Sequence, residues 1–283
     1  MVRVTWRDLI EFITFLGYPV EMDPGCVQIL ALQACKVTAA GADALDIETV
    51  PNTPDVYNDY LIVVGKNETG TPFVSAFLGT VDPGAYYTRE EPNPSGAAHL
   101  TFGVHAYVLG EHHGHEALRA KNEINRIVRD RDGDYRLDLD EQVYVGSFGT
   151  NVHAGGKSSY IGKWSAGCLN VAGGWDGPWA TFLAHAKMHL KRKGSVNVVI
   201  WSAADLVGWK RSPATFLPTV VLGVQGPWAA KVQEALRKHG DTALIVDGDW
   251  RGETSKKVAA FQASKGLTAD GVVGPKTWSY LLG

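Results

Sequence analysis

Short apolar runs separated by turn residues dominate the first 210 residues of the chain. Runs of this length, bounded by Gly, Pro or Asp–Gly, are typical of β-strands. Helical periodicity is confined to 1–20, 116–124 and 179–193. The run at 27–36 also fits a buried helix, but its length and its Pro24–Gly25 boundary favour a strand. The expected strands are 27–36, 60–64, 73–78, 104–109, 142–152 and 196–201.

The first twenty residues have the pattern of an amphipathic helix. Thr5 and Asp8 have the spacing of a capping box. Arg7, Asp8 and Glu11 interrupt the apolar run that a signal peptide requires. We therefore expect synthesis in the cytoplasm without a signal peptide. No apolar run reaches the roughly 18 residues of a membrane span, so no membrane insertion is expected.

The pattern changes near residue 210. Residues 211–220 contain Pro213 and Pro218 and are expected to link a first domain, 1–210, to a second domain, 221–283. In the second domain, amphipathic helices alternate with glycine turns.

The second domain contains an internal sequence repeat. Asp247–Gly248 precedes Thr254, and Asp270–Gly271 precedes Thr277, by seven residues each time. Each Asp–Gly pair favours a turn and each Thr favours a helix start. With a further helix at 228–239, this predicts a compact unit of three helices.

The order of residues in this domain carries a family resemblance. The residues concerned are Val232, Gln233, Leu236, Gly240, Asp247, Gly248, Gly252, Thr254, Val258, Phe261, Gln262, Gly266, Leu267, Asp270, Gly271, Val273, Gly274, Thr277, Trp278 and Leu281. In this order they resemble the three-helix peptidoglycan-binding domain family. The resemblance implies bacterial peptidoglycan as the partner. Most of these residues would build the fold, and Gln262 and Trp250 are the candidates for ligand contact.

The charge balance argues against one class of partner. The chain has 27 Lys and Arg against 30 Asp and Glu, a net charge of −3. Proteins that bind nucleic acid need a basic surface, so no nucleic-acid partner is expected. A hydrophobic content of 45% is ordinary for a folded globular protein. We expect the protein to be a monomer.

One of the three cysteines lies in a sequence suited to catalysis. Cys26 and Cys35 lie in or beside an apolar run and are expected to be buried thiols. Cys168 lies in Ser-Ala-Gly-Cys-Leu-Asn, residues 165–170, fifteen positions after His153. A thiolate nucleophile needs a base within reach and a small backbone that admits a carbonyl group. We expect Cys168 as nucleophile and His153 as base, in an ion pair that keeps the sulfur ionised near neutral pH.

Ser165 and Gly167 complete the predicted catalytic segment. Backbone N–H groups of Gly167 or Cys168 are expected to stabilise the oxyanion. Ser165 either donates a hydrogen bond or shapes the turn. The same segment also fits a cysteine that is simply packed in a tight turn.

Residues 148–170 resemble the catalytic segment of the L,D-transpeptidase family, which has an upstream His, a spacer, and then Ser/Thr-His-Gly-Cys-hydrophobic-Asn. The matching positions are His153, Ser165, Gly167, Cys168, Leu169 and Asn170. Ala166 stands where the family has its second His, and the spacer of eleven residues is shorter than usual. The segment is also similar to phage and bacterial proteins with a Ser-Ala-Gly-Cys variant. The resemblance implies a mostly β catalytic domain that forms a thioester; residues 1–147 show no clear match.

Further residues are expected to line the substrate cleft. His112 begins the run His-His-Gly-His-Glu, a loop that we expect near Cys168. Tyr86 follows a turn that would form another wall of the cleft, and Trp164 directly precedes the catalytic segment. The alternative for the His-rich run is a zinc site with a third ligand from His99, His105 or His153.

Residues 130–141 resemble an EF-hand calcium loop in spacing. Carboxylates stand at loop positions 1, 3, 5, 9 and 12, and Tyr135 stands where Gly permits the sharp turn. The alternatives are a structural Ca²⁺ site and an acidic hairpin tip that faces solvent. No cofactor is expected to be required for catalysis. The candidate calcium ligands are Asp130, Asp132, Asp134, Asp138 and Glu141.

These observations predict an α+β protein in which a mostly β catalytic domain of L,D-transpeptidase-like type precedes an all-α peptidoglycan-binding domain. We expect an endolysin-type enzyme that cleaves stem-peptide amide bonds through a Cys–His acyl-enzyme. It would reach the cell wall after holin-type release, because no export signal is visible. The alternatives are an L,D-transpeptidase that crosslinks the wall, a zinc-dependent wall peptidase, and a non-catalytic wall-binding virion protein.

Overall fold

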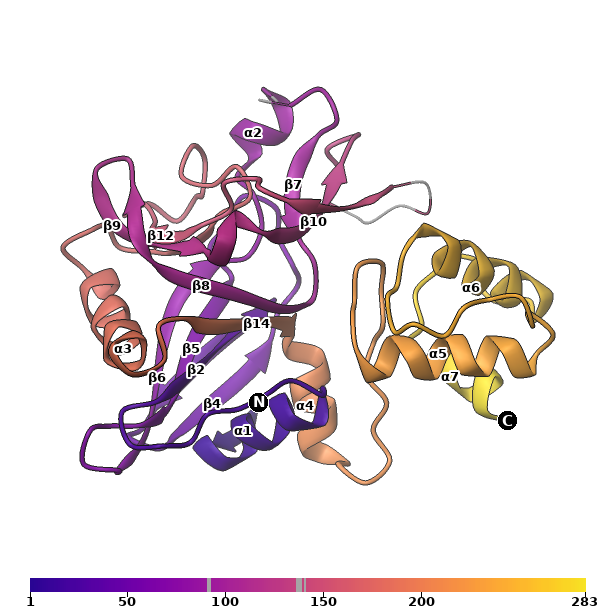
Figure 1. Cartoon of the computed structure of the whole chain (residues 1–283), viewed down its shortest axis with the longest axis horizontal. Coiled ribbons are helices and arrows are strands. Elements are labelled where there is room, and N and C mark those ends of the chain that lie inside the picture. Colours follow the sequence, from indigo (N-terminus) through magenta and orange to yellow (C-terminus); the bar gives the residue numbers. More distant parts are fainter. Residues whose placement is uncertain (91–92, 136–138, 140) are drawn as a thin grey trace.

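The structure is a computed structural model of the 283-residue chain and describes all residues except 91–92, 136–138 and 140. A β-rich body is followed by a helical C-terminal unit that lies beside it (Figure 1). The fold is therefore mixed α+β. Among the described residues, no helix combines the length and the apolar character needed to cross a bilayer.

A closed barrel forms the centre of the body. The strand order around it is β12-β13-β6-β5-β2-β14-β8-β9. β12 pairs with β13, and β14 with β2, in parallel. The barrel strands are β2 (Val27–Gln33), β5 (Asp59–Lys66), β6 (Pro72–Thr80), β8 (Gly103–His112), β9 (His115–Ala120), β12 (Val152–Ala154), β13 (Leu169–Val171) and β14 (Val196–Ser202).

β2 is apolar along almost its whole length because both of its faces are buried. Ile29 packs in the core that includes α3 (Pro178–Lys193), and its neighbour Leu30 packs in the core that includes α1 (Trp6–Phe15) and α4 (Ala203–Arg211). Successive side chains of a strand point to opposite faces, so the strand contributes to both cores.

Smaller sheets flank the barrel. β4 lies between β1 and β3 in one sheet, and β10 lies between β11 and β7 in another. The remaining elements of the body are β1 (Val2–Thr5), β3 (Cys35–Ala40), β4 (Ala44–Thr49), α2 (Ala85–Arg89), β7 (Ala97–Leu100), the 3₁₀ helix η1 (Lys121–Glu123), β10 (Asn125–Asp130) and β11 (Val143–Gly146).

Most predicted elements of the body are present. The predicted strands at 60–64, 73–78, 104–109 and 196–201 lie within β5, β6, β8 and β14, and the predicted helix at 179–193 lies within α3. The predicted strand at 27–36 is divided between β2 and β3, and that at 142–152 between β11 and β12. The N-terminal helix has its predicted capping box, but a short strand, β1, precedes it.

The predicted helix at 116–124 is wrong. The segment forms β9 and η1 instead. β9 pairs with β8 in a hairpin whose turn passes through His113 and Gly114, both with positive φ. Pairing with β8 therefore outweighs the local helical pattern.

In the C-terminal unit, the described residues form three helices: α5 (Pro227–Lys238), α6 (Gly252–Ser264) and α7 (Pro275–Leu282). α7 begins at Pro275 rather than at Thr277, since proline suits the first turn of a helix. α6 begins at Gly252 rather than at Thr254, so the predicted capping role of Thr254 is wrong.

Each of the two repeated Asp–Gly turns is held by its own buried glutamine. Gln262 Oε1 accepts a hydrogen bond from Gly271 N–H at 2.9 Å. Its Nε2 donates to Asp270 Oδ1 at 2.8 Å and to Thr277 Oγ1 at 3.1 Å. Each threonine therefore serves the fold as an acceptor inside its helix. The equivalent residues of the first repeat are Gln233, Gly248, Asp247 and Thr254.

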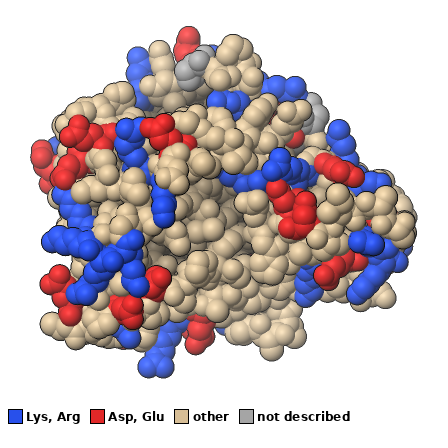
Figure 2. Space-filling view, in the orientation of Figure 1, with Lys and Arg blue, Asp and Glu red and all other residues tan. Residues whose placement is uncertain are grey.

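The C-terminal unit packs directly against the body. Trp228 Nε1 donates to Phe15 O at 3.0 Å, and the two rings lie 4.9 Å apart. Arg126 of β10 donates to Gly223 O and pairs with Asp249. Positive and negative side chains are interspersed over the face shown in Figure 2.

Candidate active site

Cys168 lies in a tight turn directly before β13. Gly167 has φ of 123°, and a Cβ there would lie 2.4 Å from Ala98 O, so only glycine fits this position. Ser165 Oγ donates to Cys168 O at 2.7 Å and accepts from Gly167 N–H at 3.1 Å. Ser165 thus shapes the turn. The Gly167 N–H is already bonded, which argues against its predicted role as an oxyanion donor.

The pairing of two short strands brings His153 to Cys168. β12 and β13 are parallel, with Val152 opposite Leu169 and His153 opposite Asn170. Cys168 is the residue directly before β13. The thiol and the imidazole therefore meet at one end of this pair.

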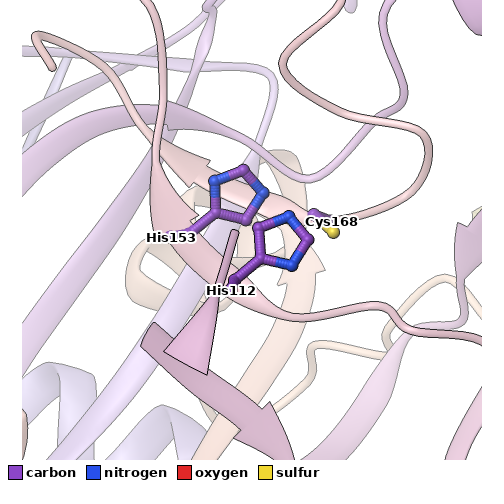
Figure 3. A group of neighbouring side chains, drawn as sticks. All are labelled: His112, His153 and Cys168. Carbon is purple, nitrogen blue, oxygen red and sulfur yellow. The ribbon is translucent and has the colours of Figure 1, made fainter. Parts of the chain in front are cut away.

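His112 joins them from the end of β8. Its ring stacks on that of His153, with centroids 4.4 Å apart and an interplanar angle of 26°. One nitrogen of each imidazole and the Cys168 sulfur all lie within 4.8 Å of one another. Figure 3 shows the three side chains converging. His112 lies near Cys168, as expected, but its stacking on His153 was not predicted.

The hydrogen bonds of His153 define its tautomer. Nδ1 lies 2.8 Å from Ala154 O. A carbonyl oxygen only accepts, so Nδ1 carries the proton and Nε2 has the lone pair. The Asn170 amide nitrogen lies 3.4 Å from Nδ1 and 3.2 Å from Nε2. Asn170 therefore helps to fix the ring.

Burial keeps both groups neutral at physiological pH. Burial, reinforced by His112, lowers the pKa of His153 to about 4. Burial raises the pKa of Cys168 to about 11, and a hydrogen bond from Asn151 N–H opposes this shift. The predicted resting ion pair is therefore wrong, because desolvation disfavours both charges.

Asn151, which was not predicted as a site residue, contacts both Cys168 and His112. Its backbone N–H lies 3.4 Å from Cys168 Sγ, and its side-chain amide nitrogen lies 3.1 Å from His112 Nδ1. Its only signal in the sequence is its position two residues before His153. Cys168 Sγ in turn lies 3.4 Å from Gly149 O.

The three side chains open onto a cavity of about 470 Å³. Among its described lining residues, none carries a carboxylate, and Lys163 contributes an ammonium group. Its walls are rich in rings, which suit the apolar faces of sugars and peptides. The ring-bearing residues are Tyr87, His112, His113, His115, Phe148, His153, Trp164 and Trp175.

Besides His112, two more of the predicted substrate residues lie at or beside this cavity. Trp164 lines it and is 39% exposed. Tyr87, rather than the predicted Tyr86, lines the wall. The Tyr86 ring lies beneath the Lys163 ammonium, 4.2 Å from its centroid. Tyr86 therefore lies beside the cavity, in contact with Lys163, which lines it.

The other histidines considered as zinc ligands lie apart from His112. His99 lies between Asp82 and Asp130, at 3.5 and 3.6 Å. His105 Nε2 lies 2.9 Å from Thr101 O. Of the three candidates, the structure brings His153 to His112.

Comparison with known proteins supports the C-terminal part of this picture. Residues 225–281 match the family model described as a putative peptidoglycan binding domain. This supports a C-terminal peptidoglycan-binding domain, and with it a role at the cell wall. No curated protein and no solved structure matches the chain.

The ligand contacts predicted within the peptidoglycan-binding domain are not exposed. Trp250 is fully buried, and its Nε1 donates to Ser255 Oγ at 2.7 Å. Gln262 is 2% exposed, and its amide is used in holding the Asp270–Gly271 turn. Both side chains stabilise the domain, which corrects their assignment to ligand contact.

The acidic loop brings three of its predicted calcium ligands together. Asp130, Asp132 and Asp134 each have a carboxylate oxygen within 4.8 Å of the others. Asp138 lies outside the described residues, and Glu141 is buried and accepts from Arg131 N–H at 3.4 Å. The calcium site stays a prediction.

Proposed function

We propose that the chain cleaves amide bonds in the stem peptides of bacterial peptidoglycan, in the manner of an endolysin. Cys168 is the nucleophile and His153 the general base. One observation carries the proposal: a thiol and an imidazole whose Nε2 carries the lone pair converge at an open cavity, in a chain that also has a peptidoglycan-binding domain.

The neutral resting pair determines how the first step proceeds. With the pKa of Cys168 at about 11 and that of His153 at about 4, little thiolate exists before the substrate arrives. The thiol proton passes to His153 Nε2 as the sulfur bonds to the carbonyl carbon. The amine leaves with that proton, and a thioester on Cys168 remains.

Water completes the reaction. Neutral His153 takes a proton from a water molecule that attacks the thioester, and returns it to the departing sulfur. The acid is released and the thiol is restored. An amine acceptor at the same step would give a crosslink instead, so the acceptor distinguishes a hydrolase from a transpeptidase.

The rest of the chain supports a wall substrate. The ring-lined cavity suits a peptide joined to a glycan. The peptidoglycan-binding domain packs on the catalytic body, so binding to the wall raises the local concentration of scissile bonds near Cys168.

Isolated sacculi test this function. We expect the wild-type protein to release new amino groups, and Cys168→Ala to release none while it still sediments with the wall. Cys26→Ala is the matched control, since Cys26 is also buried but lies directly before β2. Undiminished release by Cys168→Ala would refute the proposal. New crosslinks in place of amino groups would indicate a transpeptidase, and binding without either product a structural wall protein.

A further inference from the structure

The triad of His112, His153 and Cys168 contains more than a nucleophile and a base. Two imidazoles and one thiol come from three separate segments and place one donor atom each within 4.8 Å of the others. We infer that this triad binds a Zn²⁺ ion and that the bound ion masks the nucleophile. The masking rests on the proposed thiol chemistry, whereas the binding does not.

The donor set suits zinc. Zinc takes Cys sulfur at about 2.3 Å and His nitrogen at about 2.0–2.1 Å, and sites with three protein ligands keep the fourth position open. Sulfur and imidazole donors select zinc over Ca²⁺ or Mg²⁺, which prefer oxygen. The donors need to close by roughly 1 Å to reach tetrahedral spacing. His112, which is only partly buried and ends β8, can supply that movement.

Neighbouring groups already orient the ligands. A zinc-bound histidine usually donates its other N–H to a backbone carbonyl or a polar side chain, as His153 Nδ1 does to Ala154 O. Asn151 contacts the other two members, with its N–H at Sγ and its side-chain amide at His112 Nδ1. A half-turn of that amide would let its oxygen accept from Nδ1–H and leave His112 Nε2 free for the metal.

The open fourth position faces the cavity. Cys168 and both imidazoles line it, so an ion can enter by the route that a substrate would use. Binding replaces the thiol proton by zinc and releases that proton to solvent. The sulfur electron pair that would attack a carbonyl, and the Nε2 lone pair that would accept the proton, are then both held in metal bonds.

Titration of the metal-free full-length protein with Zn²⁺ in a calorimeter tests the binding. We expect one ion per chain at this site, with affinity reduced at least roughly tenfold in Cys168→Ala and in His112→Gln. His113→Gln is the matched control, because His113 lines the same cavity but lies outside the triad, and we expect it to bind like the wild type. Substitution by Co²⁺ should give a sulfur-to-metal charge-transfer band that Cys168→Ala lacks.

Masking has its own readout. Zn²⁺ should protect Cys168 from iodoacetamide, as measured on its tryptic peptide, and stop release of amino groups from sacculi; a chelator should reverse both. Absence of binding, or binding unaffected by Cys168→Ala and His112→Gln, would overturn the inference and leave the thiol mechanism standing. Activity that requires Zn²⁺ and is lost with the chelator would overturn both masking and the thiol mechanism.

Discussion

His153 lies directly opposite Asn170 in the parallel pairing of β12 with β13, and the Asn170 amide nitrogen is 3.2 Å from His153 Nε2. Cys168 precedes Asn170 by two residues on the same run. The register of this strand pair therefore sets the separation of the proposed base from the proposed nucleophile. A shift of one residue would turn His153 to the opposite face.

The two stacked histidines should differ in their contribution to turnover. His153→Gln removes the lone pair that takes the thiol proton, and we expect release of amino groups to fall by roughly 10²–10⁴-fold. His112→Gln leaves that lone pair in place and should cost less. Initial rates on sacculi at matched protein concentration measure both. A larger loss in His112→Gln than in His153→Gln would assign the base to His112.

Lys163 should select substrates that carry a carboxylate near the scissile bond. It contributes an ammonium group to a cavity whose described lining has no carboxylate, and a charged hydrogen bond there is worth roughly 1–1.5 kcal/mol. Lys163→Met should therefore raise KM for acidic stem peptides by roughly tenfold, with kcat little changed.

Stem peptides with an amidated carboxylate test whether the effect of Lys163→Met depends on the charge of the substrate. Amidation of the substrate carboxylate should remove the difference between Lys163→Met and the wild type. Lys157→Met is the matched control, because Lys157 is exposed nearby but does not line the cavity. Equal losses on acidic and amidated peptides would mean that Lys163 acts through packing on Tyr86 instead.

The sequence predicts strands best where apolar runs end in clear turns. β5, β6 and β14 are such runs, and each lies where it is expected. β9 is mispredicted as a helix because the hairpin with β8 that forms it is a tertiary effect. A local pattern contains no information about that pairing.

The sequence predicts which residues form the candidate site, but it does not predict their protonation states. The Gly–Cys segment and the upstream His point to Cys168 and His153, and the structure brings the two side chains together. Their protonation depends on burial, which only the packed structure defines, so the expected ion pair fails. The second repeat shows the same limit. The Asp270–Gly271 pair predicts the turn, but the sequence does not predict that the Gln262 side chain points into the core.

Gln262 should matter for stability and not for recognition. Gln262→Leu removes the acceptor of Gly271 N–H and the donor to Asp270. Buried groups left unpaired cost about 2–4 kcal/mol in the free energy of unfolding. Urea unfolding measures the loss, and Lys256→Ala, on the exposed face of the same helix, should change it by less than about 0.5 kcal/mol.

Wall binding separates the two roles of Gln262. Under conditions in which Gln262→Leu remains folded, we expect it to sediment with sacculi like the wild type, because the side chain is 2% exposed. Loss of sedimentation without loss of stability would restore the ligand-contact role that its burial argues against.

Asp205 should make the protein less stable as pH rises from 4 to 6. Burial raises the pKa of this carboxyl group to about 6, although Trp201 Nε1 and both donors of Thr219 bond to it. Because the folded state holds the proton more tightly than the unfolded state, the associated stability is complete below about pH 4. It is lost as pH rises through 6, and the loss is on the order of 2–3 kcal/mol.

Asp205→Asn removes the titrating group, so the difference in unfolding free energy between wild type and variant should change across pH 4–6.5 and level off above pH 7. Thr219→Val keeps the carboxyl group but removes one donor to its charged form. The pH range over which stability is lost should therefore move to higher pH. Urea unfolding at a series of pH values measures both. Parallel curves for Asp205→Asn and the wild type would show that Asp205 ionises in the folded protein as it does in the unfolded chain. The three hydrogen bonds would then offset the cost of burial completely.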